Sequence, residues 1–326
     1  MKQVRALGLF SGGLDSMLAV ALLRAQGIAV TGMVWTTPFF SAEQAIQSAA
    51  ALDLQLRLED LTDHFLPLLY HPPHGFGRGL NPCIDCHTLM LRQTGQIMAR
   101  EGYDFIFTGE VLGQRPFSQH RGALNLIARE SNYADLILRP LSARLLKPSR
   151  PELQGLVDRE KLLNLNGRGR KRQIALAAHF GITVFPAPAG GCLLTEPRFA
   201  SRLKELLNCQ PEVKRRDLEL LKWGRHFRLS PASRAIVGRD ERENEIIYSW
   251  RQPSDLLLQI KDYPGPLVLI PGEVHRGQLV QAATLCASYS NAPYDLPLTV
   301  EWEGPLAPEV IVAYRKPRDI FKNILL

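Results

Sequence analysis

The stretch from Val4 to Ser16 reads VRALGLFSGGLDS and determines the fold expected for the first half of the chain. Val4 to Phe10 is a short, mostly apolar run, which predicts a buried strand. Asp15 to Gln26 has the pattern of a helix that ends at Gly27. A strand, a glycine turn and a helix in this order predict a phosphate-binding unit, because glycines let backbone N–H groups approach an anion at the N-terminus of the helix.

Five residues of the turn have a chemical use in such a unit. Gly12 and Gly13 allow the backbone to approach phosphate oxygens, and the hydroxyl groups of Ser11 and Ser16 can donate further hydrogen bonds. Asp15, an acid beside phosphates, is best explained as a ligand of Mg²⁺. The turn lacks the Gly-x-x-x-x-Gly-Lys spacing of the Walker loop. A purely structural turn would need only the glycines, so the serines and the aspartate favour a nucleotide site.

The alternation of strands and helices continues beyond the turn. Strands separated by helices of this length pair in parallel through right-handed crossovers, which predicts an α/β fold with a doubly wound parallel sheet. Ligands of such sheets bind beyond the carboxyl ends of the strands, so Gly109, after the fourth strand, should border the nucleotide. The further strands are expected over Ile28–Trp35, Leu54–Leu58 and Phe105–Thr108, and the further helices over Ala42–Leu52 and Leu89–Arg100.

The run from Ser11 to Ser16 resembles the Ser-Gly-Gly-x-Asp-Ser motif of the PP-loop ATP pyrophosphatases and matches it residue for residue. The resemblance implies that the chain cleaves ATP between the α and β phosphates and leaves AMP on an oxygen of an acceptor. It also implies that the end of the second strand, around Val34, holds the adenine through backbone contacts. The motif leaves the acceptor open, because amidotransferases, NAD synthetases and tRNA-modifying enzymes share it.

Three of the five cysteines have a pattern that suggests chemistry. Cys83 and Cys86 form a Cys-x-x-Cys after a stretch rich in glycine and proline, which predicts an exposed surface loop, and Cys192 follows a predicted Gly-Gly turn. The pair allows three interpretations: half of a zinc site, to which His87 could add a ligand, a redox dithiol, or two ligands of an iron–sulfur cluster.

Two of these interpretations meet an objection. A structural zinc site normally has four ligands, and a thioredoxin-type motif should open a helix in a much smaller fold. The two other cysteines, Cys209 and Cys286, are expected to be small core residues.

A PP-loop combined with Cys-x-x-Cys and a distant third cysteine resembles the iron–sulfur-dependent tRNA thiolases. This resemblance implies a 4Fe-4S cluster on Cys83, Cys86 and Cys192, whose fourth iron can bind exogenous sulfide. The stretch Asn81 to His87 also resembles the Asn-Pro-x-x-x-Cys-Asn of 2-thiouridine synthases, with His87 in place of the last Asn. That match aligns Cys86 and Cys192 with the nucleophile and persulfide carrier of members without a cluster. Both routes stay open, and the cluster is favoured because persulfide transfer would not need Cys83.

The composition changes beyond about residue 199, which predicts two domains, 1–200 and 215–326, with a boundary near 197–215. The second is expected to be α+β. Gly224–Arg228 and Val237–Glu245 resemble the NFACT-R module, a presumed RNA-binding domain, although Asp240 replaces its usual Asn. The expected helices are Ser201–Cys209 and Arg216–Trp223, with a helix-like run at Glu241–Trp250, and the expected strands are Arg234–Gly238, Leu256–Ile260, Leu267–Ile270 and Glu309–Tyr314.

The charge distribution indicates a polyanionic partner. The net charge is +7 and the pI about 9.3, and basic residues cluster at 166–172, 214–216 and 315–318. Together with a nucleotide site, these clusters favour contact with RNA, as do the basic residues within 114–121, although Arg115 or Arg121 could instead touch ATP. No apolar run approaches the roughly 20 residues that span a bilayer, and the N-terminus lacks a signal peptide pattern. We therefore expect a cytoplasmic protein with no membrane contact.

The sequence as a whole, with its resemblances, predicts an ATP-dependent tRNA sulfurtransferase. ATP would adenylate a carbonyl oxygen of a tRNA uridine or cytidine, and sulfur from sulfide or a cysteine desulfurase-derived persulfide would displace AMP. Asp15, Cys86 and Cys192 are the predicted catalytic residues. One alternative is an amide-forming PP-loop ligase of the NAD synthetase or asparagine synthase type, which would need no cysteines. Another is a nucleotide- and RNA-binding factor without turnover.

Overall fold

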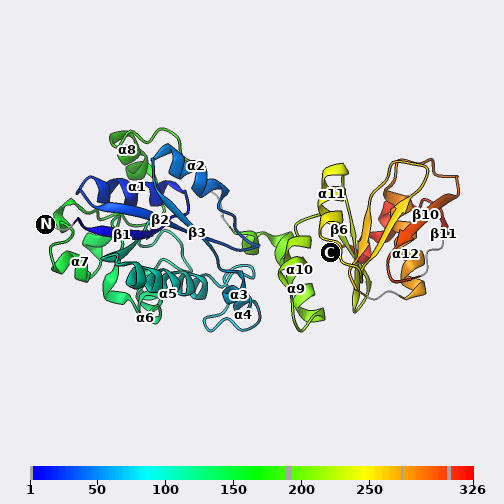
Figure 1. Cartoon of the computed structure of the whole chain (residues 1–326), viewed down its shortest axis with the longest axis horizontal. Coiled ribbons are helices and arrows are strands. Elements are labelled where there is room, and N and C mark those ends of the chain that lie inside the picture. Colours follow the sequence, from blue (N-terminus) through cyan, green and yellow to red (C-terminus); the bar gives the residue numbers. More distant parts are fainter. Residues whose placement is uncertain (1–2, 188–191, 273–274, 307–309) are drawn as a thin grey trace. The chain divides into compact units, whose positions relative to one another are not determined.

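The structure is a computed structural model that describes residues 3–187, 192–272, 275–306 and 310–326 (Figure 1). The chain divides into two compact units, Met1–Thr195 and Glu196–Leu326. None of the helices in the described ranges is long and apolar enough to cross a membrane.

A five-stranded parallel sheet with the strand order β3-β2-β1-β4-β5 forms the centre of the first unit. The prediction of a doubly wound α/β fold is therefore confirmed. The strands are β1 (Arg5–Leu9), β2 (Ala29–Thr36), β3 (Leu56–Asp60), β4 (Phe105–Thr108) and β5 (Ile137–Leu138). The last of these was not predicted, because two residues are too short to show a period.

Helices cover both faces of this sheet, as the apolar patterns require (Figure 1). One core lies under α1 (Leu14–Arg24), α2 (Glu43–Ala51) and α8 (Lys171–His179). The other lies under α5 (Cys83–Glu101) and α6 (Arg121–Glu130). The short elements α3 (Thr62–Phe65), α4 (Pro67–Tyr70) and α7 (Arg150–Leu153) complete the unit, with 3-10 turns at Ala134–Leu136, Ala143–Leu145, Arg159–Lys161 and Leu193–Thr195.

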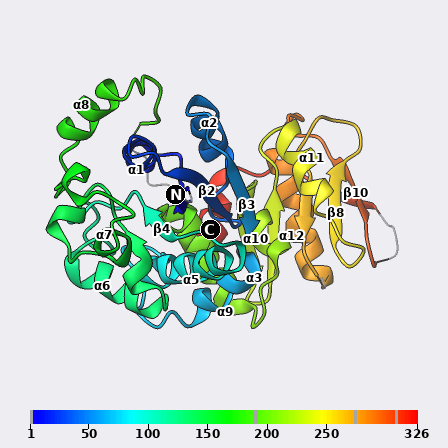
Figure 2. The ribbon, with the colours of Figure 1, turned by 60° about the vertical axis from the view of Figure 1, so that its left-hand side comes forward.

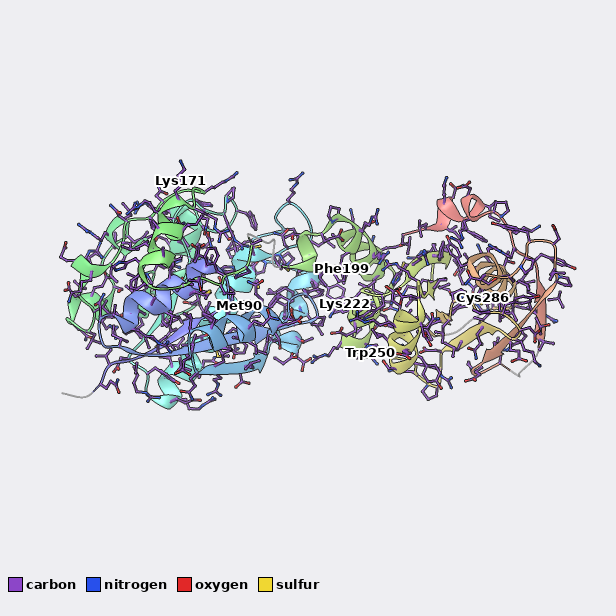
Figure 3. All side chains as sticks on the ribbon, turned by 90° about the horizontal axis from the view of Figure 1, so that it is seen from above. Met90, Lys171, Phe199, Lys222, Trp250 and Cys286 are labelled. Carbon is purple, nitrogen blue, oxygen red and sulfur yellow. The ribbon has the colours of Figure 1, made fainter. Side chains whose placement is uncertain are left out.

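Two predictions about cysteines are wrong. The Cys-x-x-Cys does not lie in an exposed loop: Cys83 is the first residue of α5, six residues before the predicted start, and Cys86 is buried. Pro82 precedes the helix, where its missing N–H costs nothing, so it marks a helix start and not a loop. Cys209 is exposed at the end of its helix and is no core residue, whereas Cys286 is fully buried (Figure 3).

The second unit is built on a six-stranded antiparallel sheet in the order β11-β10-β8-β9-β7-β6, which confirms the α+β prediction (Figure 2). Its strands are β6 (Arg225–Ser230), β7 (Ser233–Val237), β8 (Leu256–Ile260), β9 (Val268–Ile270), β10 (Leu298–Glu303) and β11 (Val310–Ala313). Glu309, predicted to start the last strand, lies outside the described residues.

The helices of the second unit pack on both faces of the antiparallel sheet. One face packs on α12 (Arg276–Tyr289), and the other packs on α10 (Arg215–Leu220) and α11 (Glu241–Ser249). The remaining helical elements are α9 (Pro197–Cys209) and a 3-10 segment at Arg318–Ile324. The sequence did not predict β6, β10 or α12.

A glycine sets the close packing at the centre of the first sheet. Gly8 lies on β1 opposite Phe107 of β4, and a Cβ atom at Gly8 would overlap the Phe107 ring, which is fully buried. The close pairing of β1 with β4 therefore requires a residue without a side chain at position 8.

We expect Gly8→Ala to destabilise the chain by about 1–3 kcal/mol, because the new methyl group overpacks a rigid core. Gly8→Ala with Phe107→Leu should cost less than the sum of the single changes, because the smaller side chain makes room. Urea denaturation measures both effects. Gly169→Ala, where a Cβ would meet nothing within 4 Å, is the control and should be neutral. Additive costs would contradict the proposed overlap.

Candidate active site

The phosphate loop sits between β1 and α1 and is braced by α2. Gly12 has a positive φ of 75°, and a Cβ there would lie 2.6 Å from the backbone oxygen of Gln44. The hydroxyl of Ser48, on α2, donates a hydrogen bond of 2.7 Å to the oxygen of Gly12. A glycine is therefore required at this position for both its conformation and its contact.

The phosphate loop presents backbone N–H groups at the start of α1 that are available to a ligand. The N–H groups of Leu14, Asp15 and Ser16 belong to the first helical turn, which has no partners for them within the helix. The Ser16 hydroxyl donates to the oxygen of Gly13 at 2.8 Å, so it stabilises the turn itself. Ser11 is exposed, and its oxygen accepts weakly from the N–H of Gly13 at 3.4 Å. This geometry suits an anion.

Asp15 has one carboxylate oxygen engaged and one free. Its Oδ2 accepts a hydrogen bond of 2.8 Å from Gln114. Its Oδ1 is buried and has no hydrogen-bond partner among the residues that the structure describes. Because a buried carboxylate oxygen is costly to leave unsatisfied, a cation at this point would complete it. The residues therefore fit a Mg²⁺ ion that accompanies a nucleotide.

Gly109 and Val34 take different positions around this loop. A Cβ at Gly109 would lie 2.6 Å from the backbone nitrogen of Ser16, so the end of β4 packs directly on the first turn of α1. Val34 lies within β2, two residues before its end, and its side chain is buried in the core shared with α1 and α2.

Hydrogen bonds bring the three cysteines to one region. Cys83 and Cys86 lie in the first turn of α5, and the Asn81 amide donates to the Sγ of Cys83 at 3.1 Å. The N–H of Leu80 donates to the oxygen of Leu194 at 3.1 Å, which ties this segment to the one that carries Cys192. Gly190 and Gly191, the predicted turn before Cys192, lie outside the described residues.

Burial is the main cause of the raised pKa values of two of the three thiols. Burial raises the pKa of Cys86 well above its usual value, and Cys192, Cys83 and Asp85 raise it further. Burial also raises the pKa of Cys192 to about 11, against a hydrogen bond from Leu194 and the nearby Arg115, which lower it. Both thiols are therefore protonated at neutral pH.

The donor set has the right chemistry for an iron–sulfur cluster, but the arrangement is not that of a ready-made metal site. Three thiols in a partly buried region are suitable ligands once deprotonated. Within the ranges that the structure covers, however, no group of three or more His, Cys, Asp or Glu side chains is placed to hold a metal ion. A cluster would therefore require the three thiol side chains to move closer together.

Sequence reasoning missed a buried charge network beside Cys86. His87, the next residue on α5, contacts Oε1 of Glu110 through Nδ1 at 2.9 Å. The other oxygen of Glu110 accepts from Arg139 at 2.8 Å and from Thr108 at 3.0 Å. The basic run 114–121 was predicted to lie near this edge, but the hydrogen bond from Gln114 to Asp15 was not predicted. No sequence signal joins these residues, because the strand order alone makes Glu110 and Arg139 neighbours.

Two family models match separate parts of the chain. Residues 1–144 match the family described as Thiamine biosynthesis protein (ThiI), and residues 224–318 match the NFACT protein RNA binding domain. The chain joins a ThiI region to an NFACT-R region. The ThiI region contains the phosphate loop, Cys83, Cys86 and the Glu110 network, and it ends before Cys192.

Individual proteins show more distant likenesses. A "Probable tRNA sulfurtransferase" of Methanosarcina mazei is 30% identical over 120 residues, which are 34% of this chain and 29% of the relative. The chain thus spans under a third of that relative's length. Two solved structures align with 17–18% identity.

The first is titled as a predicted subunit of tRNA methyltransferase from Methanocaldococcus jannaschii, with a TM-score of 0.33, covering 54% of this chain and 76% of that one. The second is a 4-thiouridine synthetase–RNA complex with bound ATP, with a TM-score of 0.37, covering 55% of this chain and 52% of that one.

Glu110 and Arg139 form a buried ion pair. Both side chains are 7% exposed. Burial alone would raise the pKa of Glu110, but Arg139 and His87 outweigh it, so the pKa lies well below its usual value. The ionised carboxylate therefore stabilises the folded chain above the unfolded-state pKa of about 4.3, and this contribution is lost as the pH falls.

We expect Glu110→Gln to lower the free energy of unfolding by about 3–5 kcal/mol at pH 7, because Arg139 is left as an uncompensated buried charge. The difference in free energy of unfolding between variant and wild type should become smaller below about pH 4.3, where the carboxyl group of Glu110 is protonated in the unfolded chain. Urea denaturation across this pH range measures it. Glu59→Gln, which breaks a partly exposed pair with Arg57, should cost under about 1 kcal/mol. A pH-independent difference would contradict this assignment.

Proposed function

We propose that this chain is an ATP-dependent tRNA sulfurtransferase, which adenylates a carbonyl oxygen of a tRNA base and replaces that oxygen with sulfur. The observation that carries the proposal is that a phosphate loop and three mutually interacting thiols belong to one sheet edge. The loop follows β1, and His87 next to Cys86 contacts Glu110, which follows the neighbouring parallel strand β4. The ThiI match and the relative named a tRNA sulfurtransferase support it.

Adenylation would use the loop residues Ser11 to Ser16. Their backbone donors would hold the phosphates of ATP, and the free oxygen of Asp15 would bind the accompanying Mg²⁺. The base carbonyl oxygen would attack the α-phosphorus, and pyrophosphate would leave. A carbonyl oxygen is a poor leaving group. Adenylation makes it part of AMP, which is a good leaving group. Gly109, which follows β4, and the backbone at Val34, near the end of β2, would border the nucleotide.

Sulfur replacement would use the cysteines in one of two forms. In the form that we favour, Cys83, Cys86 and Cys192 would hold a 4Fe-4S cluster once their side chains come together, and the cluster would supply sulfide for the replacement. In the other form, one of Cys86 and Cys192 would carry a persulfide and the other would close a disulfide as the sulfur leaves. Sulfide or a desulfurase-derived persulfide would be the donor. A cationic partner must lower the pKa of both thiols in either form.

Exposed cations lie beside this edge of the sheet. Asn166 forms a bridge with Leu112, in the segment that carries Gln114 and Arg115. The basic residues that follow include Arg168 and Lys171, and both are exposed. Lys171 is the first residue of α8 and is labelled in Figure 3. They suit the phosphates of a folded RNA.

We further assign nucleotide chemistry to residues 1–200 and RNA binding to residues 215–326, the second supported by the NFACT match. The proposed tRNA substrate agrees with the cytoplasmic location that the sequence predicts.

We expect Asp15→Asn to lower tRNA-dependent pyrophosphate release about a hundredfold or more, because a metal ligand near the reacting phosphates is lost. Release of pyrophosphate from ATP with unfractionated tRNA measures this. Asp53→Asn is the matched control, since Asp53 is exposed and precedes β3, at the opposite edge of the sheet. Undiminished release by the Asp15 variant would remove that residue from the reaction. Release without tRNA would favour another acceptor.

Cys83→Ala separates the two forms of sulfur transfer. We expect it to abolish formation of thiolated nucleosides, as Cys86→Ala and Cys192→Ala should, because a cluster needs all three thiols. Mass analysis of tRNA nucleosides is the measurement, after incubation with ATP and either sulfide or cysteine with a cysteine desulfurase, which supplies the persulfide sulfur that the second form needs. The exposed Cys209→Ala serves as control and should leave thiolation intact. Full thiolation by the Cys83 variant with the desulfurase would contradict the cluster and favour the persulfide. Thiolation by all three variants would contradict both forms, whereas a wild type that releases pyrophosphate but forms no thiolated nucleoside would favour an amide-forming ligase.

A further inference from the structure

Four arginines from separate segments gather in the second unit. Arg202 comes from α9, Arg225 begins β6, Arg239 precedes α11, and Arg318 begins the last 3-10 segment. We refer to them as the arginine cluster. Because they are remote in sequence, only the folded sheet brings them together, and no run of basic residues contains them all.

Tyr289 and Glu243 hold the cluster in place. The guanidinium carbons of Arg225 and Arg318 lie 5.0 Å and 4.8 Å from the centre of the Tyr289 ring. Glu243 accepts from the backbone N–H of Gly224, next to Arg225, at 3.2 Å, and from the N–H and side chain of Arg239, both at 2.9 Å. The side chains are therefore positioned before any ligand arrives.

Among the described residues, few carboxylate side chains pair with members of the cluster. Arg202 donates to backbone oxygens of Leu221 and Leu326, at 3.3 Å and 3.4 Å. In the part of the chain that the structure describes, Glu243 is the carboxylate that pairs with a member, through Arg239. Burial lowers the pKa of Arg202 and of Arg225, and nearby arginines lower both further.

Other cations of this unit have partners. Arg216 pairs with Asp255, Arg228 with Glu205 and Arg251 with Glu303. The arginine cluster differs from these ion pairs, because like charges held close together are costly without an anion.

We propose that the arginine cluster binds consecutive phosphate groups of an RNA backbone. Guanidinium groups match phosphate oxygens in pairs, and stacking on an aromatic ring fixes their planes. Several charges presented by four segments suit a repeating polyanion better than a single carboxylate. The inference rests on the proposed function, because it states how the tRNA partner would be held.

The test compares two double variants of the full chain. Arg225→Gln with Arg318→Gln removes two members of the cluster, while Arg251→Gln with Lys261→Gln removes two cations already paired with Glu303 and Glu301. We expect the first to bind unfractionated tRNA about tenfold or more weakly near 0.15 M salt, with a salt-dependence slope smaller by about 1 to 2. The second should change affinity by less than about twofold. Fluorescence anisotropy of labelled tRNA measures both.

Three results would overturn the inference. These are an unchanged salt slope in the cluster variant, an equal loss in the control variant, and displacement of tRNA by inorganic phosphate at matched ionic strength, which would indicate a small-anion site. If the double variant fails to fold, as judged by circular dichroism, the exposed Arg239→Gln replaces it, with an expected slope change of about 1.

Binding requires neither ATP nor the cysteines, so it can succeed where thiolation fails. Conversely, tRNA-dependent pyrophosphate release with wild-type binding by the cluster variant would refute the arginine cluster and leave the proposed function standing.

Discussion

The contact between Gly109 and the backbone at Ser16 is the constraint on which the first unit depends. It places the end of β4 against the first turn of α1, with no side chain in between. The same contact brings Glu110, the next residue, to the edge where the phosphate loop lies, and Glu110 in turn holds His87 beside Cys86. A reaction that needs phosphates and sulfur in one place would therefore depend on Gly109, because this contact leaves no room for a Cβ atom at that position.

Electrostatics around the thiols set a second constraint. Burial raises the pKa of Cys86 and Cys192, so the neutral thiol is the resting form of both. A buried thiol is a weak nucleophile and a weak ligand until a positive charge removes its proton. Arg115 already acts in that direction on Cys192. The protein thus provides a protected group whose reactivity depends on what binds next to it.

The sequence predicted local structure well where a long pattern existed. The bounds of β4 agree with the prediction to the residue, because an apolar run ends at a glycine. By contrast, β5 has only two residues, and the start of α5 was missed because cysteine, aspartate and a preceding proline look like loop residues. The ion pair of Glu110 with Arg139 depends on which strands are neighbours, and no local pattern contains that information.

The sequence alone could predict only those parts of the site that lie in one continuous segment of the chain. The loop at Ser11 to Ser16 is one segment, so its residues and spacing were visible, whereas the approach of Cys192 to Cys86 followed from a family resemblance and not from spacing. Gln114 and Arg115 show what this leaves out: the first bonds Asp15 and the second stabilises the Cys192 thiolate. Because Gln114 and Arg115 are adjacent, one short segment contacts the phosphate loop and also lies near the Cys192 thiol. A sequence pattern cannot reveal this double contact, because it depends on how the segment folds back onto the loop.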